Sequence, residues 1–499
     1  MPNLFWAALL LLCSLLSPAA WAADPAAVGG IDGVIRSIFE PVSNAIVPIV
    51  FAKIPGTEIL WIVMWLGVAS ITCTVYFRFI QFRLFGLAIQ AVRGRFSNKT
   101  DQGEVSHFQA LTTALAATVG LGNIAGVAVA ISIGGPGATF WMIMLGLFGM
   151  ATKFAECTLG VKYRQINADG SVSGGPMYYL KAGLAERGFP QFGKFLGAAA
   201  ALILAFAAFG IGNLFQVNQA TAQLMSQFQI TEGAYLFGIG FGVACAAVII
   251  GGIKSIARVT SILVPFMVVL YLLAGVIILG MNLDKLPSAF VAIINGAFTP
   301  EAGFGGFIGA LMQGLKRGAF SNEAGFGSAP IAHAAVKTNE PSTEGLVALL
   351  EPFIDTVVIC TMTALVIIVT GAYMQQGTAG AVMTSNAFNS VLPGFDVVLT
   401  ISIVLFAFST MLSWSYYGLK GWTYLFGEKT ALLYKLVFCA ISVIAAAMSL
   451  DAVIDLSDAL VFILAFFNVL GLYFLLPIVR AEINGFLHKI KTGQIKPNE

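Results

Sequence analysis

The sequence predicts an all-α polytopic membrane protein with eleven transmembrane helices, of which the second and the seventh are broken. Three observations lead to this fold class. Hydrophobic residues make up 58% of the 499 residues and charged residues only 10%, whereas ordinary soluble domains carry about 25% charged residues. Apolar runs long enough to cross a bilayer recur along the chain. Two of these runs, at 107–133 and 304–333, are interrupted by glycine and polar residues.

The N-terminal segment is predicted to be exported and then to lie at the membrane surface. Residues 1–22 have an apolar core followed by Ala20-Trp21-Ala22, which is typical of a cleaved signal peptide. Residues 23–57 mix apolar, charged and proline positions, which favours a periplasmic interfacial segment with a short helix over an additional span. Cleavage leaves the mature N-terminus outside the cytoplasm.

The eleven apolar runs divide into one extra helix and two blocks of five. The extra helix and a cytoplasmic loop occupy 58–106, and the blocks occupy 107–280 and 304–478. A periplasmic loop at 281–303 separates the blocks, and a cytoplasmic tail follows at 479–499. Because five is an odd number, the second block enters the membrane from the side opposite to the first, which is the arrangement of an inverted repeat. The runs lie at 58–77, 107–133, 139–161, 195–225, 234–251, 259–280, 304–333, 344–371, 395–418, 430–449 and 455–478.

The distribution of positive charge supports this topology. With the N-terminus outside, 20 of the 26 Lys and Arg residues lie in or beside inside loops, three lie outside, and three lie at membrane depth. Positive charge in short loops sets the orientation of membrane proteins. The sequence therefore predicts a multi-pass protein of the bacterial inner membrane with a periplasmic N-terminus and a cytoplasmic C-terminus.

The interruption in the second span is the first candidate binding site. A continuous lipid-facing helix is disfavoured here by two glycines and two polar residues, Thr118, Gly120, Gly122 and Asn123. Irregular backbone at that depth is tolerated where it lines a cavity or binds a ligand; close helix packing through the glycines is the alternative. Half-helix N–H groups suit a carboxylate and unwound carbonyls suit a hard cation. An amino acid zwitterion with sodium satisfies both, which indicates a secondary transporter.

The seventh span carries the second interruption and the densest charge. Ser321, Asn322 and Glu323 form a polar cluster that is costly in lipid unless it is buried and paired. Lys316 and Arg317 precede the cluster, and we expect them to form internal salt bridges to Glu323 or to Glu156 of the third span.

Other polar positions lie in the third, fourth, eighth and ninth spans. Glu156 is expected to accept freed backbone N–H groups or to relay protons. Glu351 and Asp355 are expected near the inner end of the eighth span, where solvation suffices for them. Gln216 in the fourth span lies among amides that are unlikely to face lipid, and the ninth span contains Ser409, Thr410 and Trp414.

Several classes of function are not supported by the sequence. The formal net charge of +2 does not indicate nucleic-acid binding. No phosphate loop indicates use of ATP, and no protease or hydrolase motif is present. The six cysteines lack CxxC spacing, and the three histidines lie near predicted membrane edges or in the tail. Alternatives left open are proton coupling, a passive channel, and an intramembrane enzyme that uses Glu156 or Glu323 as acid or base.

Four motifs resemble the alanine or glycine:cation symporter family, the sodium:alanine symporters. The resemblance covers residues 58–485 and implies the leucine-transporter fold and sodium-coupled import of alanine or glycine. The motifs are Val119-Gly-Leu-Gly-Asn-Ile-Ala-Gly-Val127, Gly134-Gly-Pro136, Gly174-Gly-Pro-Met-Tyr-Tyr179 and Phe320-Ser-Asn-Glu-Ala-Gly-Phe-Gly-Ser-Ala-Pro330.

The resemblance also implies roles for individual residues. Carbonyls of Ala116 and Val119, with Phe406, Ser409 and Thr410, are expected to hold sodium. Glu156 is expected to brace the broken seventh span, and Ala117 stands where the leucine transporter has an asparagine. The residues expected to bind the amino acid are Thr118, Gly120, Leu121, Gly122, Asn123, Phe320 and Ser321, with Gln216 and Trp414 at its side-chain end.

Overall fold

The computed structural model describes residues 41, 43–98, 100–298, 306–375, 380–448 and 451–495, without the side chains of 451–455. The predicted signal peptide lies outside these residues, and so do residues 23–40 of the interfacial segment. Helices dominate the described part of the chain. Its elements are α5 (Trp61–Tyr76), α6 (Ile80–Arg83), α7 (Phe85–Val92), α8 (His107–Thr118), η1 (Gly122–Gly126), α9 (Val127–Gly134), α10 (Ala138–Lys162), β1 (Gln165–Ile166), β2 (Val172–Ser173), α11 (Pro176–Glu186), α12 (Pro190–Phe209), η2 (Gly210–Leu214), α13 (Phe215–Phe228), α14 (Ala234–Ile249), α15 (Gly252–Met281), η3 (Leu283–Lys285), α16 (Leu286–Phe298), α17 (Gly306–Asn322), α18 (Ala329–His333), α19 (Pro341–Ala348), α20 (Leu350–Pro352), η4 (Phe353–Cys360), α21 (Thr361–Thr370), η5 (Ala372–Met374), α22 (Gly380–Asn389), α23 (Phe395–Phe426), η6 (Glu428–Thr430), α24 (Ala431–Ala447) and α25 (Asp451–Lys491).

Seven helical stretches among the described residues are long and apolar enough to cross a membrane. They are α10, the run from α12 to α13, α15, the run from α19 to α21, α23, η6 with α24, and most of α25. An eighth results if α8 and the η1 and α9 unit count as one span, because these two parts are bent by 53° at a short break. The shorter apolar helices α5 and α14 coincide with the predicted runs 58–77 and 234–251. The remaining predicted run, 304–333, contains α17 and α18.

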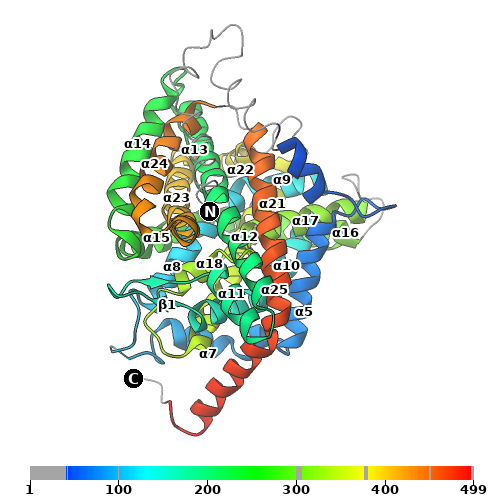
Figure 1. The fold of residues 1–499 in the computed structure, drawn as a ribbon. Helices are drawn as coiled ribbons and strands as arrows, with labels where there is room; N and C mark the ends of the chain where they lie inside the picture. Colours follow the sequence, from blue (N-terminus) through cyan, green and yellow to red (C-terminus); the bar gives the residue numbers. More distant parts are fainter. Residues whose placement is uncertain are drawn as a thin grey trace.

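The helices pack side by side around a core in which both interruptions are buried. Figure 1 shows α25 beside α10 and α5, while α14 and α24 pair at the opposite side of the bundle. Between these sides, α8 contacts α15 and α23, and α10 contacts α17 and α19. The interrupted helices therefore lie between α10 and α23.

Local sequence signals set the ends of several helices. Ser106 and Gln109 form a reciprocal capping box at the start of α8. Pro176, Pro190 and Pro341 occupy the first turns of α11, α12 and α19, where a missing N–H costs nothing.

Short helices in the connections were not predicted from the sequence. These unpredicted helices are α11, α16 and α22. In another connection, β1 pairs with β2 as a small antiparallel hairpin. α22 packs on η1, where the Thr384 hydroxyl donates to the Ile124 carbonyl at 3.0 Å. A carbonyl freed by the π-helical turn is thereby satisfied without water.

Helix contacts in this bundle depend on close backbone approach, and Gly418 of α23 provides a test. A Cβ at this position meets the Tyr434 hydroxyl at 1.9 Å and the Ala208 Cβ at 2.5 Å. We expect Gly418→Ala to destabilise the purified protein by about 1–3 kcal/mol through overpacking. Gly240→Ala on α14 is the matched control, because no atom lies within 4 Å of its Cβ. Thermal unfolding in detergent measures both, and equal melting temperatures would contradict the packing argument.

Candidate functional site

The first interruption lies between α8 and α9. Helical structure stops after Thr118, and the chain continues through Val119 and Gly120 into the π-helical turn η1. The Asn123 side-chain carbonyl accepts the backbone N–H of Gly120 at 2.8 Å. A Cβ at Gly120 would lie 2.9 Å from the Thr410 hydroxyl, so glycine allows the opened backbone to approach α23.

The second interruption separates α17 from α18 at residues 323–328. Glu323 adopts a left-handed backbone with φ of 52°, and Gly325 and Gly327 have φ of 95° and 75°. The Asn322 side chain accepts the N–H of Ala324 at 2.9 Å, and the Ser328 hydroxyl donates to Glu323 at 2.5 Å. Side chains of the segment thus satisfy part of the polarity that its unwinding exposes.

The two interruptions touch each other. The Asn123 amide donates to the Ser321 hydroxyl at 3.2 Å, and a Cβ at Gly122 would lie 3.6 Å from the Phe320 ring. Asn123 and Ser321 are buried. Residues that are about 200 positions apart in the sequence therefore form one polar centre.

Asp355 of η4 lies at this centre. Its two carboxylate oxygens accept the Asn123 amide and the Ser321 hydroxyl, each at 2.6 Å, and Thr356 donates at 2.8 Å. The sequence-based expectation that solvent stabilises Asp355 near the inner end of its span is wrong, because its side chain is fully buried. Within the described part of the chain, every hydrogen-bond donor to this carboxylate is a neutral group.

Glu156 of α10 holds the unwound segment of the second interruption. Its carboxylate accepts the N–H of Gly325 at 3.2 Å and of Gly327 at 2.9 Å. Asn468 of α25 donates to the same carboxylate at 2.5 Å and to the Gly325 carbonyl at 2.8 Å. Tyr179 in turn donates to Asn468 at 2.5 Å. This geometry favours an acceptor role over acid or base chemistry for Glu156.

Two hydroxyl groups join α8 to α23. Thr410 donates to the Ala116 carbonyl at 3.0 Å, and Ser413 donates to the Thr113 carbonyl at 2.7 Å. The Ser409 hydroxyl instead donates to its own helix, to a carbonyl at position 406, at 2.9 Å. The structure therefore places Thr410 directly beside the opened end of α8.

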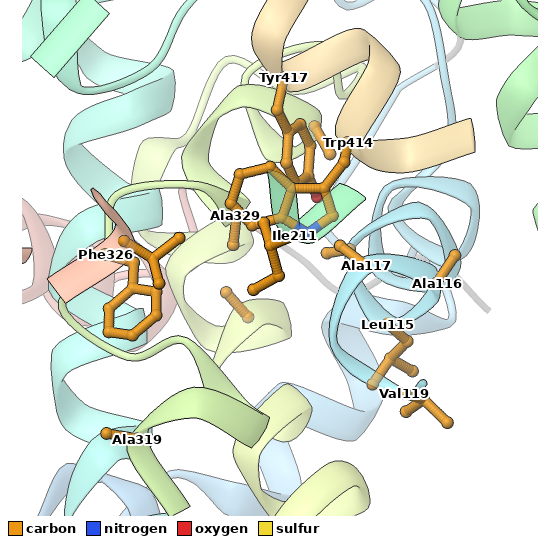
Figure 2. Packing of buried hydrophobic residues seen from close by; sticks show 14 of the residues in the cluster. Leu115, Ala116, Ala117, Val119, Ile211, Ala319, Phe326, Ala329, Trp414 and Tyr417 are labelled. Carbon is orange, nitrogen blue, oxygen red and sulfur yellow. The ribbon is translucent and has the colours of Figure 1, made fainter. Parts of the chain in front are cut away.

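Buried polar atoms without a hydrogen-bond partner lie at the other side of the opened backbone. Gln216 directs its Oε1 towards Gly120, whose Cβ would lie 3.9 Å away, and this oxygen has no partner. The indole N–H of Trp414 faces the Glu323 carboxyl, and the Tyr417 hydroxyl has no hydrogen-bond partner. Figure 2 shows Trp414 and Tyr417 projecting together beside Ile211. Such atoms are expected where a polar ligand or water supplies the missing bond.

The remaining predicted site residues are placed as follows. Val119, Leu121 and Phe406 are fully buried, and Figure 2 shows Val119 near Ala116 at the end of α8. The Thr118 hydroxyl lies 3.4 Å from the carbonyl at position 115 of its own helix. Arg317 differs from expectation: its guanidinium lies 3.8 Å from Asp458 of α25, and not against Glu323 or Glu156.

A buried ion network joins α8, α10, α18, α19 and α20, and sequence reasoning missed it. His333 of α18 contacts Glu344 through Nδ1 at 2.5 Å and Glu351 through Nε2. His107 contacts the other oxygen of Glu344, and Lys153 lies 3.2 Å from Glu351. All five side chains are at most 3% exposed, although the histidines had been expected near the membrane edges. The available signal was the spacing of 344, 351 and 355, which places three carboxylates on one helix face.

The same region contains three potential metal ligands. The ligand atoms of Cys157, His333 and Glu351 lie within 4.8 Å of one another. Both ring nitrogens of His333 already face carboxylate oxygens, and Glu351 also faces Lys153. The arrangement therefore favours a hydrogen-bonded ion network over a metal centre.

The fold has a counterpart among solved structures. The crystal structure of MhsT in complex with L-phenylalanine superposes with a TM-score of 0.54 at 16% identity, covering 77% of this chain and 99% of that chain. The chain thus belongs to the class of integral membrane proteins with the leucine-transporter fold. Within that class, the chain belongs to the sodium:alanine symporter family, whose model matches residues 46–499. The resemblance seen in the sequence motifs is confirmed.

Relatives of the chain are named for several substrates. The chain is 44% identical over 442 residues to the sodium/alanine symporter AgcS of Methanococcus maripaludis, covering 88% of this chain and 95% of the relative. It is 36% identical to YrbD of Bacillus subtilis, a putative sodium/proton-dependent alanine carrier protein, covering 84% and 87%. It is also 31% identical to GlnT of Bacillus subtilis, a probable sodium/glutamine symporter, covering 88% and 91%.

The ion network makes a prediction about stability. Glu351→Gln leaves the buried Lys153 and His333 without their shared carboxylate, and removal of one partner from a buried ion pair costs about 3–5 kcal/mol. We expect a large fall in the unfolding temperature in detergent. Glu58→Gln is the control, because its pair with Lys53 is exposed and worth at most about 1 kcal/mol. If both variants melt alike, the network does not stabilise the fold.

Proposed function

We propose that the protein is a symporter that couples sodium entry to the uptake of a small neutral amino acid, alanine or glycine. The observation that carries the proposal is the polar centre of Asn123, Ser321 and Asp355 where the two interruptions meet. Membership of the sodium:alanine symporter family supports the same substrates.

The chemistry of Asp355 explains why a cation belongs in this centre. An ionised carboxylate away from water is costly unless a positive charge compensates it, and its donors here are all neutral. A metal cation, a proton or the ammonium group of a substrate supplies that charge. A neutral amino acid and a cation together bring the charge that the site lacks.

The parts of the site divide between ion and substrate. Carbonyls of Ala116 and Val119 hold sodium against α23, with Phe406, Ser409 and Thr410. The opened backbone from Thr118 to Asn123, including Leu121, with Phe320 and Ser321, receives the amino and carboxyl groups. Gln216 offers its unpartnered Oε1 at the other side of this backbone, where Trp414 lies near the substrate side chain.

Alternating access requires two broken spans that work together. In the proposed topology, eleven spans comprise one extra helix and two inverted blocks of five, in the bacterial inner membrane, with a periplasmic N-terminus and a cytoplasmic C-terminus. Sodium favours the outward-open form, and occupancy by both solutes allows the inward-facing form to be reached. Glu156 and Glu323 stabilise the unwound second interruption during this change.

Coupling is tested by radiolabelled alanine uptake into proteoliposomes at a clamped membrane potential. We expect uptake to collapse when the inward sodium gradient is removed, because sodium must occupy its site before the inward-facing form is reached. Asp355→Asn removes the buried charge while keeping the side-chain shape, and we expect it to abolish uphill accumulation. Exchange of unchanged alanine, without chemical conversion, separates transport from an enzyme.

Proton coupling is the second candidate, and Asp355 is the observation that favours it, since a buried carboxylate also accepts a proton. A pH gradient that drives uptake as well as a sodium gradient does, at the same potential, would establish this mechanism and remove the sodium proposal. Competition by glycine, serine and glutamine against alanine ranks the substrates.

The substrate centre gives a further prediction. Asn123→Ala leaves the Gly120 N–H without its acceptor and removes the amide donor to Asp355, and an unsatisfied buried group costs about 1–3 kcal/mol. We expect the KM for alanine to rise about tenfold or more. Asn389→Ala at the exposed end of α22 is the control. Unchanged KM in Asn123→Ala, measured in the same proteoliposomes, argues against this site.

A further inference from the structure

A cavity of about 90 Å³ lies between the end of α5, the short helix α6 and the C-terminal part of α25. Arg78, Arg83 and Arg480 line it, and the other lining residues are aromatic, aliphatic or amide side chains. Among the residues that the structure describes, no ion pair joins any of these three arginines to a carboxylate. Three positive charges therefore converge on one hollow without an internal counter-charge.

The backbone at this corner is held in an unusual conformation. Arg78 and Phe79 are consecutive and both left-handed, with φ of 55° and 56°, a conformation that non-glycine residues rarely adopt. Arg480 is positioned by its guanidinium lying 5.2 Å from the centre of the Tyr76 ring. The corner thus directs an arginine from each side of the cavity into fixed positions.

An apolar stripe leads to the cavity from the membrane side. Val68, Ile71 and Val75 are exposed on one face of α5 by 49%, 48% and 58%. Their spacing of three and four residues forms a continuous helical stripe. Phe79 and Phe82 extend the exposed apolar surface beside the arginines. A ligand that fits both features has an anionic head and long apolar chains.

We propose that this cavity binds the phosphate head group of an anionic phospholipid, with the acyl chains along the exposed face of α5. Basic pockets between membrane helices on the cytoplasmic side recognise anionic head groups in this way. The site is separate from the substrate centre, because none of its lining residues takes part in that centre. A free phosphate ion shares the head-group chemistry but gains nothing from the apolar stripe.

The test uses the full-length protein in phosphatidylcholine nanodiscs with increasing fractions of phosphatidylglycerol. Native mass spectrometry counts the phosphatidylglycerol molecules retained per protein. We expect the combined Arg78→Gln, Arg83→Gln and Arg480→Gln variant to need about 100-fold more phosphatidylglycerol for half-saturation. Arg187→Gln, an exposed arginine at the end of α11, is the matched control and should bind as the wild type does.

Two further arms keep the proposal falsifiable. If the combined variant does not fold, the single Arg83→Gln variant should weaken binding about fivefold, because Arg83 is exposed and loses one charge only. Phe82→Ala should weaken the binding of phosphatidylglycerol and leave the binding of soluble glycerol phosphate unchanged. The proposal is overturned if the arginine variants retain as much phosphatidylglycerol as the wild type does. It is also overturned if inorganic phosphate at the same concentration as the lipid displaces it completely.

Discussion

The structure depends on the contact between two unwound helices deep in the bundle. Unwinding frees backbone N–H and C=O groups, and in hydrocarbon each needs an internal partner. Asn123 meets this need for the first interruption by bonding to Gly120 and reaching Ser321. Glu156 does so for the second by accepting two glycine N–H groups. Buried side chains thus satisfy part of the polarity that each interruption exposes.

The buried carboxylates differ in whether their hydrogen-bond and ion-pair partners are charged. Glu344 and Glu351 are paired with histidines and a lysine, so their burial is compensated within the protein. Among the described residues Asp355 has only neutral donors, and under the proposed function an exchangeable cation compensates its charge. Burial is the same for all three carboxylates, whereas the charge of their partners differs.

Sequence periodicity and glycine placement predicted the helical runs and both interruptions, because each is a local property of the chain. The central role of Asp355 could not be predicted in this way. Its distance from the membrane surface depends on how the span is wound, and the π-helical stretch η4 shifts the register that a regular helix would have. Similarly, the partner of Arg317 is Asp458 of α25, far along the chain, and no local sequence pattern predicts such a contact.

The seam between α8 and α23 has a mechanical consequence. It is bridged by the hydroxyl groups of Thr410 and Ser413, and each such bond contributes only about 0.5–1.5 kcal/mol. The ion network, by contrast, joins α8, α18, α19 and α20 to α10 through paired charges. We therefore expect a change of conformation to open the hydroxyl-bridged seam before it disturbs the ion network, so that the helices joined by the network move together.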